Sequence, residues 1–212
     1  MASTYSSDLK LELVTTGEKA GLWGTITNTN LQILQQSSSG YLALAVGGSD
    51  VTLSLDNGAT SNGKNLYIKL TGTLTANRTV TMPASAERVF IIEDATVRGT
   101  SNRTLSVLTA SGTALPISVG ATMLVKSDGT NTTKGITQKG YNTITDSNTP
   151  YTAIAADQIL ANTTANPITI LLPASPVTGD EVTIIDARGT WGSNNCIINR
   201  NGKPINSATN NL

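Results

Sequence analysis

The side chains that most often perform chemistry are scarce in this chain of 212 residues. It contains no histidine, a single cysteine, and 14 acidic against 14 basic residues. Histidine is the commonest general base and the commonest metal ligand in proteins. Its absence excludes Ser-His and Cys-His nucleophile systems, and no glycine-rich phosphate loop is present. We therefore expect no enzyme, no catalytic residue, no metal site and no cofactor.

The nearest approach to a catalytic pair is the acidic dipeptide Glu93-Asp94. A glycosidase needs two carboxyl groups that flank one bond, whereas adjacent residues of a β-strand point to opposite faces. The dipeptide Asp94-Ala95 recurs as Asp186-Ala187. We expect both aspartates to close strands and to accept hydrogen bonds from the turns that follow.

One loop carries residues suited to binding. Trp191 lies in the polar loop from Gly189 to Asn195, and an exposed loop tryptophan can stack on a sugar. Trp191, Asn194 and Asn195 therefore form a candidate glycan contact. The alternative is that the indole packs against its own domain. The neighbouring Cys196 stands in an apolar run and is expected to be a small buried hydrophobe.

Charge and hydropathy exclude two classes of partner. The net charge is zero and no basic stripe is present, so we expect no nucleic-acid partner. The longest apolar runs, such as residues 168–172, are far shorter than the roughly 20 residues that span a bilayer. The first eight residues lack the basic and apolar regions of a signal peptide. We expect a soluble protein made in a cytoplasm, with no membrane partner.

The composition favours strands. Only 13% of the residues are charged and 4% aromatic, and short β-branched runs alternate with Asn, Asp and Gly, which suit tight turns. An internal repeat is visible: residues 75–85 recur as 164–175, and 89–95 as 181–187. We predict an all-β protein with two tandem small β-sandwich-like repeats, module 1 at residues 41–139 and module 2 at residues 140–212.

The second copy of the repeat is shorter than the first. Module 1 continues through a predicted strand at residues 121–126, whereas module 2 reaches Lys203-Pro204-Ile205 and has no counterpart of that strand. An unpaired edge would remain. Either the polypeptide continues beyond Leu212, which we favour, or another subunit supplies the strand.

The one predicted helix covers about residues 21–38, inside an N-terminal segment of residues 1–40. Gly40 ends the pattern. A helix this short is marginal alone, so it should dock on the β-body, on symmetry mates or on a partner. After it, residues 41–46 and 51–55 alternate in hydropathy around a Gly-Gly-Ser-Asp turn, which predicts a hairpin. The apolar stripe of the helix falls at 3.6-residue spacing and comprises Leu22, Ile26, Asn30, Ile33 and Leu34.

Two stretches carry a family resemblance. Residues 5–12, 17–18 and 21–30 resemble the N-terminal signature of tail-fibre proteins of tailed bacteriophages, notably those of cyanobacterial hosts. Within module 2, residues 151–153, 157–161, 172–176, 179–182 and 184–187 resemble a module common in phage fibres. These motifs are structural rather than catalytic.

The resemblance implies an elongated, homotrimeric fibre in the virion tail, assembled in the host cytoplasm. Its N-terminal segment would attach to tail or baseplate proteins, and any host glycan would be bound distally. The alternative is a carbohydrate-binding adhesin that uses Trp191. The residues expected at the attachment or trimer interface are Leu22, Trp23, Ile26, Asn30, Ile33 and Leu34.

Overall fold

The N-terminal segment folds as a hairpin laid along a helix. Strands β1 (Thr4–Tyr5) and β2 (Glu12–Leu13) pair antiparallel, and α1 (Trp23–Ser39) follows. The predicted helix is confirmed, with its start and end displaced by one or two residues. Gly40 stops it by turning to an extended conformation, φ −67° and ψ 131°. The computed structural model describes residues 3–84, 86–99, 103–138, 140–205, 207 and 209–212.

After the helix, the chain winds through three coils, each of which adds one strand to each of two sheets. In one sheet β3, β5 and β7 pair in parallel, and in the other β4, β6 and β8 do so. Such stacking is a β-solenoid arrangement, in which each coil contacts its neighbours. The strands are β3 (Tyr41–Ala45), β4 (Val51–Thr52), β5 (Tyr67–Thr73), β6 (Arg78–Met82), β7 (Glu87–Val97) and β8 (Leu105–Thr109), with a 3-10 turn η1 (Asn62–Lys64).

Three antiparallel strands close the last coil of module 1. Strand β9 (Leu115–Pro116) pairs with β8, β10 (Thr122–Asp128) pairs with β7, and β11 (Thr132–Gln138) pairs with β10. The core between the sheets is apolar. It includes Ile68, Leu70, Val80, Phe90, Ile92, Leu105, Val107, Met123 and Val125, all at most 1% exposed.

Module 2 repeats the three-coil arrangement on a smaller scale. One sheet has the order β12-β14-β16 and the other β13-β15-β17, with every neighbouring pair parallel. A separate core holds Ile144, Ile159, Ala161, Ile168 and Ile170. The strands are β12 (Tyr141–Ile144), β13 (Tyr151–Thr152), β14 (Gln158–Ala161), β15 (Ile168–Leu171), β16 (Thr183–Asp186) and β17 (Cys196–Asn199), with a 3-10 turn η2 (Asp146–Asn148).

The structure confirms a mostly β fold with one helix and corrects the predicted sandwiches. A β-sandwich packs antiparallel sheets, whereas the strands of both modules stack in parallel coils. The hairpin expected at residues 41–55 is also wrong, because β3 and β4 lie in different sheets. Gly47 instead turns the chain from one sheet to the other, and a Cβ there would lie 2.5 Å from the carbonyl oxygen of Thr73.

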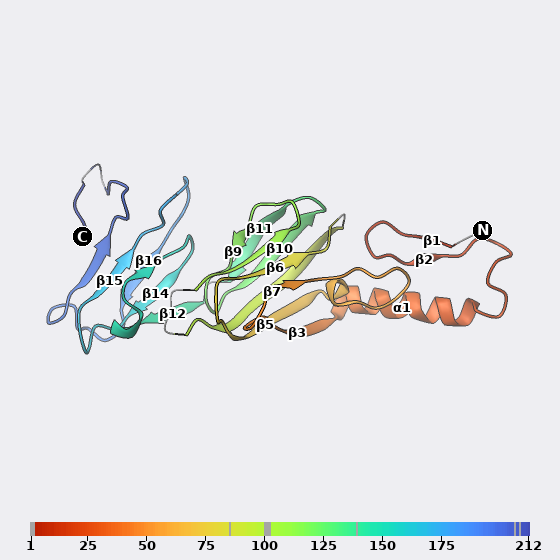
Figure 1. Ribbon diagram of the computed structural model, residues 1–212, viewed down its shortest axis with the longest axis horizontal. Helices are drawn as coiled ribbons and strands as arrows, with labels where there is room; N and C mark the ends of the chain where they lie inside the picture. Colours follow the sequence, from red (N-terminus) through yellow and green to blue (C-terminus); the bar gives the residue numbers. More distant parts are fainter. Residues whose placement is uncertain (1–2, 85, 100–102, 139, 206, 208) are drawn as a thin grey trace.

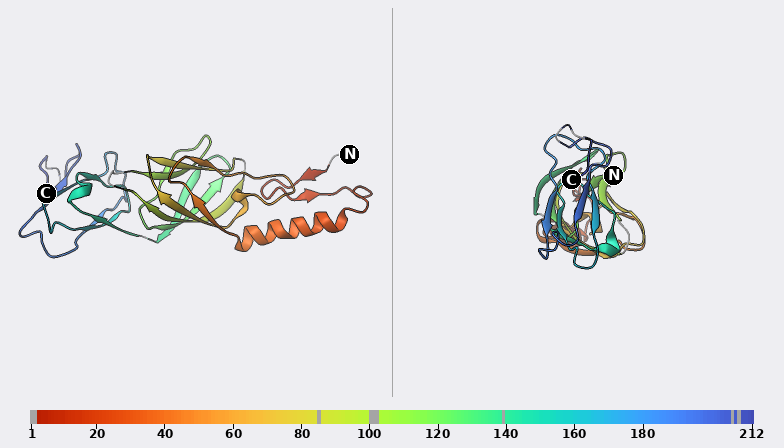
Figure 2. Two further views of the ribbon diagram at one scale, coloured as in Figure 1. Left: turned by 60° about the horizontal axis from the view of Figure 1, so that its bottom comes forward. Right: turned by 90° about the vertical axis from the view of Figure 1, so that its left-hand side faces the viewer.

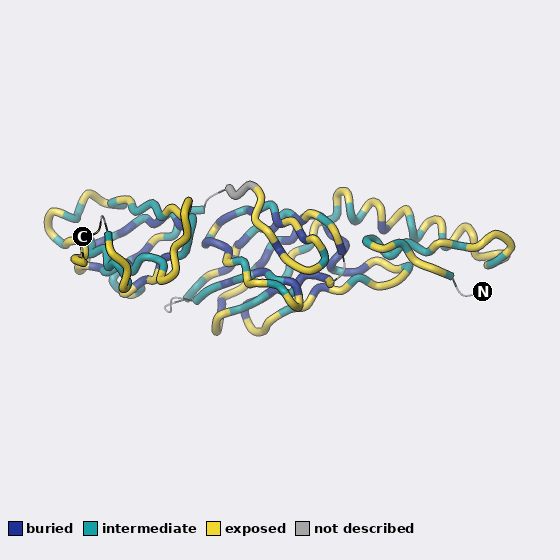
Figure 3. The backbone as a smooth tube through the Cα atoms, turned by 90° about the horizontal axis from the view of Figure 1, so that it is seen from above, coloured by how far each residue is buried: buried dark blue, intermediate teal, exposed yellow. Residues whose placement is uncertain are grey.

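The repeat in the sequence matches equivalent coils. Residues 75–85 and 164–175 contain β6 and β15, and residues 89–95 and 181–187 contain most of β7 and all of β16. The modules lie end to end in an elongated molecule, with α1 and the β1–β2 hairpin at one end and the C-terminus at the other (Figures 1 and 2). Figure 3 shows that buried residues concentrate in the coils, whereas most of the helix is exposed.

Candidate functional site

One face of α1 is occupied by its own chain. Ile33 is fully buried. The Asn30 side chain accepts a hydrogen bond from the Glu12 amide at 3.0 Å and donates one to the Glu12 carbonyl at 2.9 Å. Six residues further on, Gln36 donates to the Ser61 carbonyl at 3.0 Å. This face therefore holds the helix against the β1–β2 hairpin and the loop before η1.

Beside this face, α1 exposes a second apolar stripe. Trp23, Leu31 and Leu34 are 54%, 57% and 42% exposed. At 100° per residue, Leu34 lies about 20° and Leu31 about 80° around the helix from Trp23, so the three share one side. The helix has no charged residue from Trp23 to Ser39. Large exposed apolar side chains without surrounding charge are typical of an interaction surface. We call Trp23, Leu31 and Leu34 the outer stripe.

The six interface residues predicted from the sequence divide between these two faces. Asn30 and Ile33 make contacts within the chain, and Ile26 is half-buried. Leu22, Trp23 and Leu34 are exposed. Sequence reasoning missed Leu31, which lies eight residues after Trp23 and three before Leu34. That spacing is helical and could have identified the outer stripe as a second apolar face.

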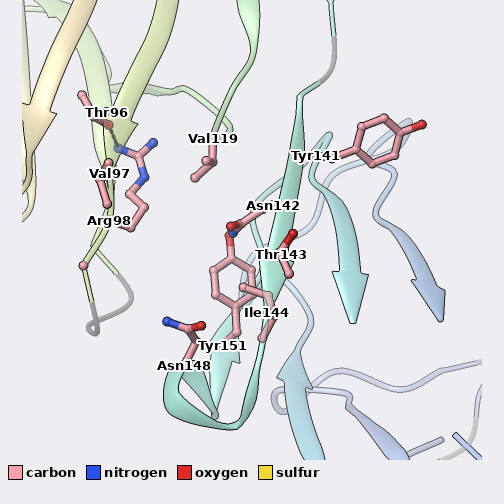
Figure 4. Close-up of a pocket in the computed structure, with 11 residues that line it drawn as sticks. Thr96, Val97, Arg98, Val119, Tyr141, Asn142, Thr143, Ile144, Asn148 and Tyr151 are labelled. Atoms are coloured by element: carbon pink, nitrogen blue, oxygen red, sulfur yellow. Dashed lines mark hydrogen bonds between the residues drawn. The ribbon is translucent and has the colours of Figure 1, made fainter. Parts of the chain in front are cut away.

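A cleft of about 330 Å³ lies where the two modules meet. Figure 4 shows Arg98 reaching into it from module 1 and Asn142 beside Tyr151 in module 2, while the Tyr141 ring points away. Arg98 forms an ion pair with Asp94 and donates to Thr96 and to the Ile117 carbonyl. Arg98, which lines the cleft, therefore belongs to a buried charge pair.

Module 2 contributes a second buried carboxylate near Arg98. Asp157 accepts hydrogen bonds from the Tyr151 hydroxyl and the Ile154 amide, both at 2.9 Å. Burial raises the pKa of Asp157, against the opposing effect of these donors and of the Arg98 charge. Burial likewise raises the pKa of Asp94, although Arg98 and Thr96 oppose the rise. Arg98 and Asp94 bond each other within module 1, and Tyr151 and Asp157 do so within module 2, so each side of the junction has its own buried polar cluster.

The chain matches no family model, no curated protein and no solved structure. Within the described residues, no three His, Cys, Asp or Glu side chains gather closely enough to hold a metal ion. In the same part of the chain, no helix combines the length and hydropathy needed to cross a bilayer.

The residues of the candidate glycan loop mostly contact their own module. Trp191 is half-buried against the module 2 core, and its backbone amide donates to Asp186 at 3.1 Å. Asn194 donates from its side chain to the Thr163 and Thr164 carbonyls, at 2.9 and 3.3 Å. Only Asn195 of the three predicted residues is exposed. Cys196 is half-buried and packs against the same core.

The acidic residues lie as the strand pattern predicts, with one difference. Asp94 points into module 1, whereas Glu93 pairs with Lys69 at 2.9 Å and accepts the Tyr67 hydroxyl at 2.8 Å. Lys69 and Tyr67 lower the pKa of Glu93. Asp186 ends β16 and accepts three amides of the following turn. Asp94 does not close its strand but lies inside β7, because β5 continues to pair with β7 from Asp94 to Val97.

Proposed function

We propose that this chain is a non-enzymatic structural protein of a fibre, the proximal part of a bacteriophage tail fibre. In this proposal the N-terminal segment, residues 1–40, attaches the fibre to a tail or baseplate protein, and three copies associate as a homotrimer in the virion. The phage assignment rests on the resemblance of residues 5–34 and of module 2. The structural role rests on the coils and the helix.

The observation that carries the proposal is the outer stripe of α1. Fully burying one large apolar side chain contributes about 1.5–3 kcal/mol, and three such side chains on an uncharged helix favour contact with another protein surface. Because the inner face already packs on the hairpin, the stripe is free to contact other copies or a partner. The two stacked modules supply an elongated body behind this surface (Figure 1).

The proposal is tested by the double substitution Leu31→Gln and Leu34→Gln. Glutamine keeps the helix propensity close to that of leucine but removes the apolar surface. We expect the wild type to sediment as a trimer and the double variant to dissociate, with unchanged circular dichroism. Gln32→Ala is the matched control, because Gln32 is exposed and lies on the side away from the stripe. A wild type that stays monomeric and does not bind purified phage baseplates would contradict the proposal.

A further inference from the structure

A groove lies where the C-terminal end of α1 meets module 1. Its volume is about 390 Å³, which falls within the roughly 300–1,000 Å³ typical of small-molecule sites. Strand β3 begins two residues after the helix ends, so side chains of the helix and of the sheet come together there (Figure 1). The residues that line this glutamine groove include Gln32, Gln35, Gln36, Ser39, Tyr41 and Asn65.

One wall of the glutamine groove is a polar face of α1, separate from the outer stripe. At 100° per residue, Gln35 lies about 120° and Gln32 about 180° around the helix from Trp23. Both glutamines are exposed, and within the described part of the chain neither side-chain amide forms a hydrogen bond. Each amide can therefore offer an acceptor and two donors to a ligand.

A nearly buried amide adds to the polar lining. Asn65 is 6% exposed, and its Nδ2 donates to the Asn62 carbonyl at 3.0 Å. Its Oδ1 lies beside Gly40, which also lines the groove, because a Cβ on that glycine would come within 2.7 Å of it. No hydrogen bond reaches this oxygen from the residues that the structure describes. A nearly buried acceptor without a donor favours a ligand that donates to it.

Tyr41 gives the glutamine groove a rigid aromatic surface. It is 60% exposed and stacks on Tyr67, with the ring centroids 5.5 Å apart and the planes at 23°. Tyr67 is held in turn, since its hydroxyl donates to Glu93 at 2.8 Å. Tyr67 does not line the groove, so the Tyr41 ring has one face on Tyr67 and the other exposed. A tyrosine fixed in this way contacts a ligand at little cost in conformational entropy.

The lining indicates the class of ligand. Among the described residues, no charged side chain lines the groove, and Lys69 near the tyrosines is paired with Glu93 at 2.9 Å. A phosphate-bearing ligand would favour lysine or arginine, and a hard metal ion would favour carboxylates. Hydroxyl groups donate and accept hydrogen bonds, as amides do, and the apolar face of a sugar ring can stack on tyrosine. A neutral sugar satisfies both parts of the lining.

We propose that the glutamine groove binds a neutral saccharide, with one sugar ring stacked on Tyr41. Gln32 and Gln35 exchange hydrogen bonds with its hydroxyl groups, and the Asn65 oxygen accepts one more. The site uses neither the outer stripe nor the candidate glycan loop of module 2. It therefore does not depend on the attachment role proposed for α1.

A glycan array tests the full chain. It carries neutral oligosaccharides of hexoses and N-acetylhexosamines, with sialylated and sulfated glycans as anionic counterparts. We expect binding to at least one neutral glycan and none to the anionic ones. In a solution titration of that glycan, Tyr41→Ala should weaken binding about tenfold or more, whereas Tyr41→Phe, which keeps the ring, should change it less than about threefold. Gln35→Ala should weaken it about fivefold, through loss of a hydrogen bond.

Two matched controls and one spectrum locate the site. Tyr141→Ala removes a tyrosine that is 57% exposed at the start of module 2, and Asn195→Ala removes the exposed amide of the candidate glycan loop. Both variants should bind as the wild type does. The side-chain amide signals of Gln32, Gln35 and Asn65 should shift in NMR spectra when the glycan is added.

Three outcomes would overturn the proposal. One is a wild-type chain that binds no neutral glycan or prefers the anionic ones. Another is wild-type affinity in both Tyr41→Ala and Gln35→Ala, which are changes at exposed side chains. The third is binding that Tyr141→Ala or Asn195→Ala abolishes while Tyr41→Ala retains it, because the saccharide would then lie in module 2.

Discussion

Buried carboxylates, rather than exposed ones, are the distinctive residues of this molecule. Asp94 and Asp157 are each 1% exposed and lie on the two sides of the module junction. Burying an ionised carboxylate is costly unless donors compensate it. Asp94 pairs with Arg98 and accepts a hydrogen bond from Thr96. Asp157 accepts hydrogen bonds from the Tyr151 hydroxyl and the Ile154 amide. The sequence indicated Asp94 only as the end of a strand, and it did not reveal Asp157, because the donors to Asp157 come from the fold around it.

A pH dependence follows for Asp157. Its pKa is raised in the folded protein, so the folded state binds the proton more tightly than the unfolded state does. The contribution of this group to stability is therefore present below about pH 4 and is lost as the pH rises through the raised pKa. Asp157→Asn keeps an acceptor for Tyr151 and has no proton to release. We expect the free energy of unfolding of the variant, minus that of the wild type, to increase from pH 4 to pH 7.

Urea unfolding of both proteins at several pH values measures this difference. Comparing the two proteins cancels the titration of the other carboxylates, including those whose pKa is lowered, such as Glu93 and Asp128. Asp146→Asn is the control, since Asp146 is not buried and its carboxylate bonds Asn166 at the surface. If the free energy of unfolding of Asp157→Asn instead falls relative to wild type as the pH rises, the hydrogen-bond donors outweigh burial in setting the pKa of Asp157.

At the scale of elements, the sequence predicted the strands and the helix better than their pairing. The alternation of buried and exposed side chains is the same in a parallel and an antiparallel strand, so the pattern could not distinguish a solenoid from a sandwich. A constant coil length would have done so. Here stacked partners are 17 residues apart at Tyr141 and Gln158 but 29 apart at Val51 and Val80. Loops of variable length conceal the coil period.

The helix illustrates the same limit at the candidate site. Its apolar pattern was read as one stripe, which joined residues from two faces. Ile33 is buried, and Asn30 bonds the β1–β2 hairpin, which folds back on the helix in a tertiary contact. Trp23 and Leu34 remain outside. The helix was therefore predictable, but the division of its residues between packing and an interaction surface was not.

The side-chain amide of Asn30 makes the hydrogen bonds between the helix and the hairpin. Asn30→Ala removes both hydrogen bonds to Glu12, and at about 1 kcal/mol for each the hairpin should lose about 2 kcal/mol of local stability. Hydrogen exchange at residues 4–13 is expected to accelerate, while β5 and β7 stay protected. Asn28→Ala, at an exposed position of the same helix, is the control. Unchanged exchange in the hairpin would mean that other contacts hold it.

At the scale of the whole molecule, the two modules have separate apolar cores joined by a polar junction. Among the described residues, module 1 buries 15 in its cluster and module 2 buries seven. In stacked-coil proteins each unit is stabilised by itself and by its nearest neighbour. The smaller core of module 2 makes it the less stable unit. Unfolding should then proceed in two steps, with module 2 first.

An equivalent pair of core residues tests this order of unfolding. Ile68 on β5 and Ile159 on β14 occupy the same place in their modules, and both are fully buried. Truncating either to alanine costs about 2–5 kcal/mol. Ile159→Ala should lower the urea midpoint of the first step only, as read by hydrogen exchange at residues 158–171. Ile68→Ala should lower the second midpoint, read at residues 67–97. If either substitution shifts both midpoints together, the Arg98 junction couples the modules into one cooperative unit.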